Sequence, residues 1–209
     1  MEPEYIYYPA DELRYDHLRN YYGILEVKEP HAELDLGCGS GSFTVALACR
    51  YPESRIYAAD MLKGRLKKLI KRADSEYCFN IYPMQVEARY LLGRLIPDGS
   101  FDRIHLLCPD PWPKDRHRGH RLLTSDFTTH IHRVLKKDGI FHFSSDDVNY
   151  CNAVGRILEA SGLFVPFQEG IEDIKDIRSD FEKRWRNQGL DVPHRAWKKV
   201  QPPVPEIGH

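Results

Sequence analysis

Strand-like and helix-like segments alternate along most of the chain, and this alternation restricts the possible folds more than any other feature. Short apolar runs typical of strands cover residues 32–36, 54–59, 78–86, 101–108, 140–143 and 163–168. Helical spacing of apolar residues is found from 42 onward and at 62–73, 88–96, 125–136 and 149–161. Gly139 is expected to stop the helix that begins at Ser125. The alternation predicts an α/β fold, with a mostly parallel central sheet and helices on both faces.

Length and terminal segments favour one domain over residues 1–209, with a helical N-terminal extension at 1–30 and a disordered tail at 200–209. The first residues lack a basic region followed by an apolar one, and no apolar run reaches membrane-spanning length. The sequence therefore predicts a cytoplasmic protein without a membrane partner. A formal net charge of −1 argues against an overall basic nucleic-acid binder, so any such binding must come from local patches.

Cysteine and histidine spacing indicates neither a disulfide framework nor a metal site. The five cysteines are odd in number, widely spaced and without a C-x-x-C pair. They are predicted to be thiols of a reducing compartment. His117 and His120 lie on an arginine-rich stretch without a thiolate partner, so no metal ligands are expected there.

Acidic residues lie at or just after the ends of five predicted strands. They are Asp35, Asp60, Glu87, Asp110 and Asp146. Parallel sheets of this kind bind ligands at the carboxyl ends of their strands. Five carboxylates on one rim repel one another, so we expect a ligand there that is rich in hydroxyls, amines or positive charge.

A glycine-rich turn follows the first predicted strand. Asp35-Leu-Gly-Cys-Gly-Ser-Gly41 has glycines at alternate positions, Gly37, Gly39 and Gly41, which let the backbone turn tightly and approach a ligand closely. A dinucleotide fingerprint would read G-x-G-x-x-G, and NAD binding stays open as an alternative. Here the acidic residue precedes the first glycine, which suits an amino group better than a phosphate. Asp60 can accept hydrogen bonds from ribose hydroxyls. Together these features resemble the class I S-adenosylmethionine (SAM)-dependent methyltransferases.

A proline-rich loop follows the predicted strand at 101–108. Pro109, Pro111 and Pro113 each fix φ and remove a donor, so the side chains between them have few conformations. The same loop carries Asp110, Trp112, Lys114 and three arginines. A surface loop this stiff is expected to present a site, and the alternative is a solvated basic turn.

This loop carries a second, more specific resemblance. Pro109-Asp-Pro-Trp-Pro-Lys114, followed by Arg116, His117 and Arg121, resembles the signature of the bacterial tRNA (guanine-N7)-methyltransferases. The resemblance runs from about residue 32 to 192, and Ser179-Asp-Phe-Glu-Lys-Arg184 is similar to the family's T-x-F-E-x-R motif. Its departures are Asp35 where glutamate is common, Gly119-His120 in place of a basic pair, Ser179 for threonine, and Asp147 where an aromatic residue is common.

The resemblance implies a Rossmann-like SAM-dependent enzyme that methylates N7 of a guanine in tRNA, at guanosine 46 of the variable loop, forming 7-methylguanosine. Asp110 is the implied catalytic residue. The implied cofactor-binding residues are Asp35, Gly37, Gly39, Gly41, Asp60, Glu87 and Asp110. The implied substrate-binding residues are Lys114, Arg116, Arg118, Arg121, Asp146, Ser179 and Glu182. The expected partner is tRNA, with no metal, and the expected assembly is a monomer or homodimer.

The chemistry fits these residue types. Guanine N7 has a free lone pair, so catalysis requires alignment of nucleophile and methyl group and no strong base. Asp110 would stabilise the positive charge that methylation leaves on the base. A hydrogen bond from Asp110 to the guanine edge or to the methionine amino group is an equally open role.

The sequence also leaves alternatives open. One is a SAM-dependent methyltransferase that acts on an amino group of another nucleic acid or of a small molecule, since Asp110-Pro-Trp112 partly matches a [DN]-P-P-[YF] loop. Another is a catalytically inactive RNA-binding relative. Ser179 and Glu182 can also be read as a capping box at a helix start. The basic face of residues 63–72 is as consistent with a solvated surface as with an RNA contact.

Overall fold

The computed structural model describes residues 27–110 and 122–201. Most of the predicted N-terminal helical extension at 1–30, nearly all of the predicted tail and loop residues 111–121 lie outside the described part. A single domain over the whole chain therefore stays a prediction.

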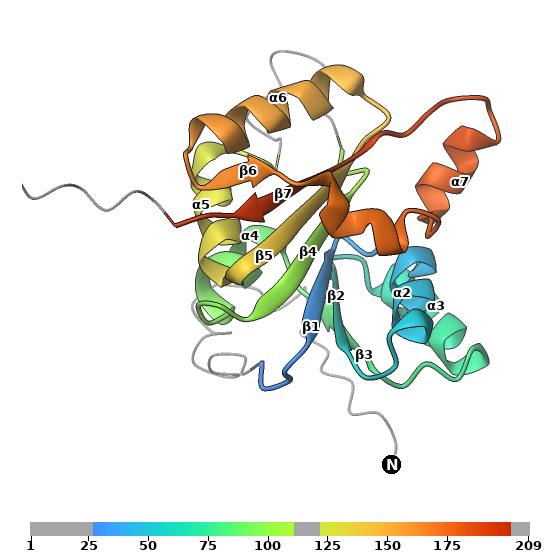
Figure 1. Ribbon diagram of the computed structural model, residues 1–209. Coiled ribbons are helices and arrows are strands. Elements are labelled where there is room, and N and C mark those ends of the chain that lie inside the picture. The colour runs from blue at the N-terminus through green and yellow to red at the C-terminus, as the bar shows by residue number, and fades with distance from the viewer. Residues whose placement is uncertain (1–26, 111–121, 202–209) are drawn as a thin grey trace, which may run out of the picture.

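A seven-stranded sheet forms the centre of the protein (Figure 1). Its strands are β1 (Ala32–Leu36), β2 (Arg55–Asp60), β3 (Ile81–Gln85), β4 (Phe101–Leu107), β5 (Leu135–Ser144), β6 (Phe164–Pro166) and β7 (His194–Lys199). They are ordered β3-β2-β1-β4-β5-β7-β6. The first five strands pair in parallel, and β7 pairs antiparallel with both β5 and β6. The predicted α/β class with a mostly parallel sheet is confirmed.

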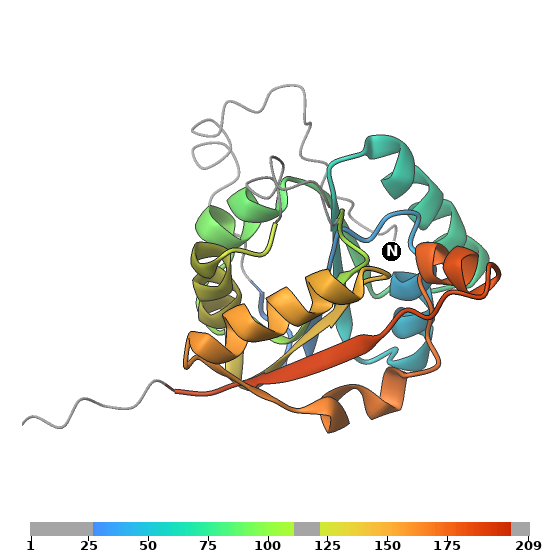
Figure 2. The same cartoon turned by 90° about the horizontal axis from the view of Figure 1, so that it is seen from above.

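Helices cover both faces of the sheet (Figures 1 and 2). One face carries α2 (Ser42–Arg50), α3 (Lys63–Ser75) and the 3-10 helix η4 (Gln168–Ile174). The other carries α4 (Ala88–Tyr90), the π-helix η2 (Leu91–Leu95), α5 (Ser125–Val134) and α6 (Val148–Ala160). Each layer buries a separate apolar cluster against the strands, so the sheet is shielded on both sides and its carboxyl edge is left for a ligand. None of the helices in the described part is long and apolar enough to cross a membrane.

Two local features differ from the sequence-based expectation in informative ways. Gly139 does not end a helix, because α5 ends at Val134 and β5 begins at Leu135. The pairing of β5 with β4 shifts register between Phe101 and Arg103, and a Cβ on Gly139 would lie 3.2 Å from the carbonyl oxygen of Asp102. Gly139 thus permits a β-bulge. Strand β7 is the second difference, since the sequence pattern does not predict it.

The cysteine prediction is wrong for one pair. Cys49, near the end of α2, and Cys78, between α3 and β3, form a disulfide with Cα atoms 5.7 Å apart. They are 29 residues apart in sequence, and the packing of α2 beside α3 brings them together. Cys38, Cys108 and Cys151 are free thiols, as predicted.

Candidate active site

A cavity of about 300 Å³ opens at the carboxyl ends of β1 and β4. It is lined on one side by the glycine-rich turn and on the other by the start of α7 (Asp180–Arg186). Its lining residues are Asp35, Gly37, Cys38, Gly39, Ser40, Ser42, Phe43, Arg65, Lys68, Leu107, Ser179, Asp180, Phe181 and Arg184. The predicted glycine turn, one predicted carboxylate and part of the predicted C-terminal motif therefore meet around one hollow.

Positive backbone angles shape the glycine turn. Gly37 and Gly39 have φ values of 82° and 58°, which an L side chain rarely adopts. The backbone N–H groups of Gly37 and Cys38 both donate to the carbonyl oxygen of Ala59, at 2.8 and 3.0 Å. The turn is thus fastened to the end of β2, and it presents backbone without side chains at Gly37 and Gly39 to the cavity.

Asp35 is a buried carboxyl group in the cavity wall. Its side chain accepts a 2.5 Å hydrogen bond from the hydroxyl of Thr44 in α2. Burial raises the pKa of Asp35 to about 7; the Thr44 hydrogen bond lowers it and the charge of Asp60 raises it further. A group held this far from its ordinary pKa becomes a strong partner for a cation that enters the cavity.

Asp60 connects the end of β2 to the glycine turn. Its carboxylate accepts from the backbone N–H of Gly39 at 3.1 Å and from that of Leu62 at 2.8 Å, and Arg65 lies 3.4 Å away. Asp60 is buried, so these bonds hold the turn in its ligand-facing shape. The contacts place Asp60 behind the turn, next to the cavity lining.

The other three carboxylates follow their strands at the same edge of the sheet. Glu87 caps α4 by accepting from the backbone N–H of Tyr90 at 2.8 Å. Asp110 is exposed and follows β4 after Cys108, which has a φ of 48° and donates its N–H to Ser144. Asp146 is half-buried just after β5. In the described part of the chain, the cavity lining includes Asp35 but none of these three.

Helix α7 begins as the capping interpretation predicts, but only in part. Ser179 caps it by accepting from the backbone N–H of Glu182 at 3.1 Å. The carboxylate of Glu182 does not turn back to the helix start. It is 1% exposed, forms ion pairs with Arg178 and Arg186 at 2.8 and 2.7 Å, and lies 3.0 Å from Nε2 of His194. The buried carboxylate of Glu182 therefore holds α7 in place through these contacts, and Ser179 lines the cavity.

Contacts with α2 and α3 hold α7 over the cavity. The hydroxyl of Ser42 donates to the carbonyl oxygen of Arg178 at 3.1 Å, and the Lys183 ammonium donates to Ser42 at 2.5 Å. Arg72 of α3 forms an ion pair with Asp180 at 3.3 Å. Figure 1 shows α7 beside α2 and α3. The cavity is thus closed on one side by a segment far away in sequence.

Sequence reasoning missed several residues of this site. Thr44 supports the cavity wall through its hydrogen bond to Asp35 and belongs to no recognised motif. Phe181 and Arg184 line the cavity and belong to the motif at Ser179–Arg184, but they are not among the site residues that the resemblance implies. Conversely, Lys114, Arg116, Arg118 and Arg121 lie outside the described residues. Within the described ranges, no group of three or more histidine, cysteine or acidic residues is arranged to hold a metal ion.

Comparisons with known proteins agree with this geometry. A family model described as "Putative methyltransferase" matches residues 30–194. The tRNA (guanine-N(7)-)-methyltransferase of Neisseria meningitidis serogroup B is 31% identical over 170 residues, covering 80% of this chain and 69% of that protein. The protein of that name from Thermotoga maritima is 31% identical over 158 residues, covering 75% and 50%. The one from Syntrophotalea carbinolica is 36% identical over 121 residues, covering 58% and 52%. The chain spans about half the length of the last two.

Solved structures match at the level of the fold. The 16S rRNA methyltransferase KamB has a TM-score of 0.61 at 15% identity, covering 95% of both chains. A SAM-dependent methyltransferase from Aquifex aeolicus has a TM-score of 0.56 at 15% identity, covering 84% of this chain and 85% of that one. The sheet order gives the protein the Rossmann-like fold of these structures, and the family model makes it a class I methyltransferase. Within that class, the chain belongs to the bacterial tRNA (guanine-N7)-methyltransferase family.

Proposed function

We propose that this protein transfers a methyl group from SAM to N7 of a guanine in tRNA, forming 7-methylguanosine. The observation that carries the proposal is the cavity in which the glycine turn faces a buried carboxyl group, in a chain of this family. The finer proposal is guanosine 46 of the variable loop as target. We further propose that the protein acts in the cytoplasm as a monomer or homodimer.

The proposed cofactor contacts follow from the position of each residue. Asp35 would bind the methionine amino group, because its buried carboxyl group gains most from a cationic partner. Gly37, Gly39 and Gly41 would let the backbone approach the cofactor. Asp60 would accept from the ribose hydroxyls while it fastens the turn, and Glu87, at the end of β3, would lie near the adenine.

The proposed chemistry needs positioning more than proton transfer. SAM, when bound, supplies an electrophilic methyl group, and guanine N7 already carries a lone pair. Asp110 would stabilise the charge that develops on the purine, since it follows β4 at the cavity edge of the sheet. Asp146, Ser179 and Glu182 would hold the substrate base, either directly or through α7.

The deciding experiment mixes the protein, isotopically labelled SAM and unmodified tRNA, and analyses the nucleosides by mass spectrometry. The expected product is labelled 7-methylguanosine. Label on an exocyclic amino group would instead support the amino-methylating alternative. SAM binding by calorimetry without transfer to any tRNA would support the inactive RNA-binding relative.

Asp35 predicts a pH dependence of SAM binding. Its folded-state pKa of about 7 lies above the ordinary value of 3.8, so the folded protein binds more protons than the unfolded chain between these values. The free protein should therefore lose stability as pH rises through this range. If SAM requires the ionised form, its affinity should rise about 5- to 10-fold between pH 6 and 7.5. Calorimetry should show this rise in the wild type and a flat profile in Asp35→Asn. A pH-independent wild-type affinity would remove Asp35 from the amino-group contact.

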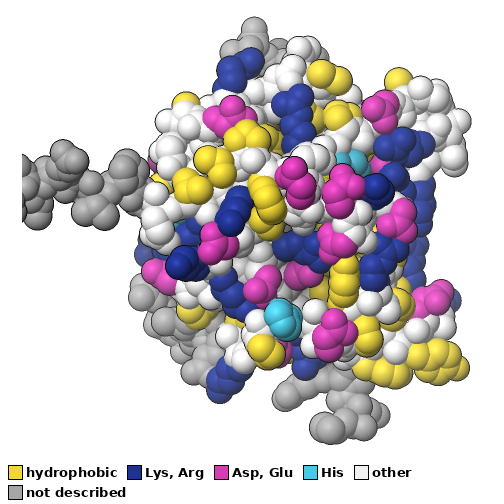
Figure 3. All heavy atoms as spheres, viewed as in Figure 1, with side chains coloured by type: hydrophobic (Ala, Val, Ile, Leu, Met, Phe, Trp, Pro, Cys, Tyr) yellow, Lys and Arg dark blue, Asp and Glu magenta, His cyan; other side chains and the backbone are white. Residues whose placement is uncertain are grey.

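The outer face of α3 is a second candidate RNA surface besides the loop. Lys63, Lys67, Lys68 and Lys71 are exposed, and the ion pairs of the described residues include none of them. Lysine and arginine side chains gather in the region of Figure 3 where Figure 1 places α3 and α7. Because Arg72 ties α3 to α7, this basic face adjoins the cavity on one side.

Salt dependence of tRNA binding separates the two surfaces. Removing one phosphate contact should reduce the slope of log affinity against log salt by about 0.7–0.9. We expect twice this reduction, about 1.4–1.8 for two lost contacts, in Arg116→Gln/Arg121→Gln, and also in Lys67→Gln/Lys71→Gln if α3 contacts RNA. A matched control is Lys137→Gln/Lys175→Gln, two exposed lysines away from the cavity. An unchanged slope in the arginine double variant would show that the loop does not contact phosphates.

A further inference from the structure

The cavity beside the glycine turn has a cationic side that the proposed cofactor contacts do not use. Arg65 and Lys68 of α3 and Arg184 of α7 line it, together with the buried carboxyl group of Asp35. At about 300 Å³ the cavity is of a size that suits a small molecule. Groups of opposite charge around one small hollow predict a ligand that carries both charges itself.

Packing of α3 against the glycine turn brings two of these cations to the cavity. A Cβ on Gly41 would lie 2.5 Å from Cγ of Leu69, so the turn and the helix are in direct contact. Because residues three and four apart lie on the same face of a helix, Arg65 shares its face with Lys68 and Leu69. Of the exposed lysines of α3, Lys68 is the one that lines the cavity in the described part of the chain.

Helix α7 supplies the third cation from the other side of the cavity. The guanidinium group of Arg184 lies over the ring of Phe181, 5.7 Å from its centroid, and both side chains line the cavity. A cation–π contact uses no hydrogen-bond donor, so the N–H groups of Arg184 stay available to a ligand. Phe181 thus holds the guanidinium group beside the cavity without neutralising its charge.

Lys68 and Arg184 differ from the other cations near the cavity because they have no acidic partner. Within the described ranges, neither side chain takes part in an ion pair or a hydrogen bond. An anion that enters the cavity can therefore form charge-assisted hydrogen bonds with both, and no existing ion pair has to break. The neighbouring arginines already have partners: Arg65 pairs with Asp60, Arg72 with Asp180, and Arg178 and Arg186 with Glu182.

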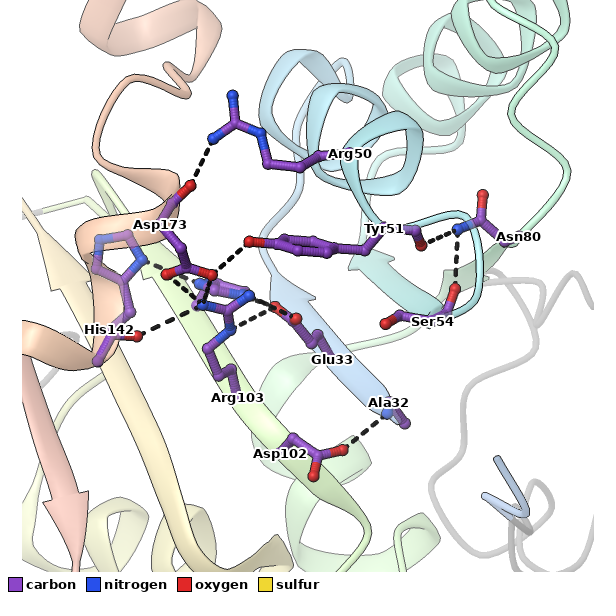
Figure 4. A network of polar contacts seen from close by, with 12 residues as sticks. Ala32, Glu33, Arg50, Tyr51, Ser54, Asn80, Asp102, Arg103, His142 and Asp173 are labelled. Atoms are coloured by element: carbon purple, nitrogen blue, oxygen red, sulfur yellow. Dashed lines mark hydrogen bonds and ion pairs between the residues drawn. The ribbon is translucent and has the colours of Figure 1, made fainter. Parts of the chain in front are cut away.

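The position of α7 does not depend on these two cations. Helix α7 follows η4, which a network of polar contacts fastens to the sheet and to the end of α2 (Figure 4). Arg103 of β4 bridges Glu33 of β1 and Asp173 of η4, at 2.8 Å each. The hydroxyl of Tyr51, which follows α2, also donates to Asp173. The side of the cavity that α7 forms is thus built before a ligand binds, and replacing the two unpaired cations should leave α7 in place.

The amino-acid end of SAM carries both charges, an ammonium group and a carboxylate on the same carbon atom. We propose that Lys68 and Arg184 bind this carboxylate, and that they make the protein select SAM over related compounds without the carboxylate. This rests on the proposed function, in which SAM is the cofactor and Asp35 binds the ammonium group. A tRNA phosphate is the competing anion, and it fits less well, because the ionised carboxylate of Asp35 in the same cavity would repel it.

Decarboxylated SAM is the probe that isolates the carboxylate, because it keeps the sulfonium and amino groups of SAM. Calorimetry should show that the wild type binds SAM about 10- to 100-fold more tightly than decarboxylated SAM. In Lys68→Gln/Arg184→Gln this selectivity should largely disappear, because SAM binds more weakly while decarboxylated SAM does not. The charge-conserving Lys68→Arg should keep most of it. Lys137→Gln/Lys175→Gln is the matched control, since it removes the same charge away from the cavity and should leave the selectivity unchanged.

The possible results separate this inference from the proposed function. Equal affinity of the wild type for the two compounds would overturn the carboxylate contact alone, and so would selectivity that persists in the double variant. A wild type that binds neither compound would overturn the contact together with the proposed cofactor. Selective SAM binding without methylation of tRNA would support the contact while the proposed function fails.

Titration with tRNA tests the competing anion. In Lys68→Gln/Arg184→Gln, the slope of log affinity for tRNA against log salt should equal that of the wild type, because the two cations face the cofactor. A slope reduced by about 1.4–1.8, with the selectivity for SAM unchanged, would assign both cations to tRNA phosphates and overturn the proposal.

Discussion

Replacing Asp110 with asparagine is expected to lower turnover by about 10²–10³, the usual loss when a preorganised electrostatic partner is removed from a developing charge. Asparagine keeps the size and hydrogen-bonding capacity of the side chain and removes its negative charge. Asp110 is exposed just after β4, and Cys108 before it is fixed by its N–H bond to Ser144, so the substitution should leave the fold unchanged. Binding of SAM and tRNA should persist, because Asp35 and the arginines of the loop are intact.

Single-turnover methylation with saturating SAM and tRNA measures this effect separately from binding. Because no general base is required, the rate of the chemical step should not show the rise toward neutral pH that would mark the deprotonation of a base. Asp98→Asn is a matched control: Asp98 is an exposed carboxylate in the turn before β4, paired with Arg133 away from the cavity. Near-wild-type turnover in Asp110→Asn would exclude charge stabilisation by this residue. A loss traced wholly to weaker SAM or tRNA binding would make Asp110 a binding residue.

The fold could be predicted because its strongest signals are local. Each parallel strand lies between helices and has a continuous apolar stretch, which the sequence displays directly. Strand β7 has no such signal, since only Ala196 and Trp197 of its six residues are buried. Its existence depends on the free edges of β5 and β6, which no local pattern reports. The role of Gly139 is ambiguous in sequence for a related reason. Glycine after a polar stretch is typical both of a helix end and of a β-bulge such as the one near Phe101, and the sequence alone does not distinguish them.

The candidate site also has one part that the sequence predicts and another part that it does not. Asp35 and the glycine turn are consecutive in sequence, so their meeting at the cavity could be expected from the motif alone. Glu182 is expected from sequence to contact substrate or to cap its helix, and nothing in Ser179–Arg184 indicates that its carboxylate points toward the sheet. The contacts of His142 with His105 and with His194 are invisible in the sequence for the same physical reason, because the three histidines are isolated residues of separate strands. Only register brings them into contact.

The Cys49–Cys78 disulfide predicts a large dependence of stability on redox conditions. It closes a loop of 29 residues that contains β2 and α3, and the chain-entropy relation gives about 3–4 kcal/mol for a loop of this length. Reduction should lower the free energy of unfolding by this amount, measured by denaturant titration with and without reductant. Cys49→Ser should reproduce the loss without reductant, and because Cys49 is exposed, the substitution leaves no cavity in the core.

Thiol counting ties this stability change to the bond itself. Alkylation of the unfolded, unreduced protein should modify Cys38, Cys108 and Cys151, and all five cysteines should react after reduction. Cys49→Ser should be indifferent to reductant in the same denaturant titration, which controls for effects of the reductant elsewhere. If five thiols react without reduction and the unfolding midpoint ignores reductant, the protein holds free thiols only, as the cysteine spacing predicts. In a reducing compartment such as the proposed cytoplasm, α2 and α3 would lose the covalent link between them. The glycine turn before α2 and the basic face of α3 would then depend on non-covalent packing alone.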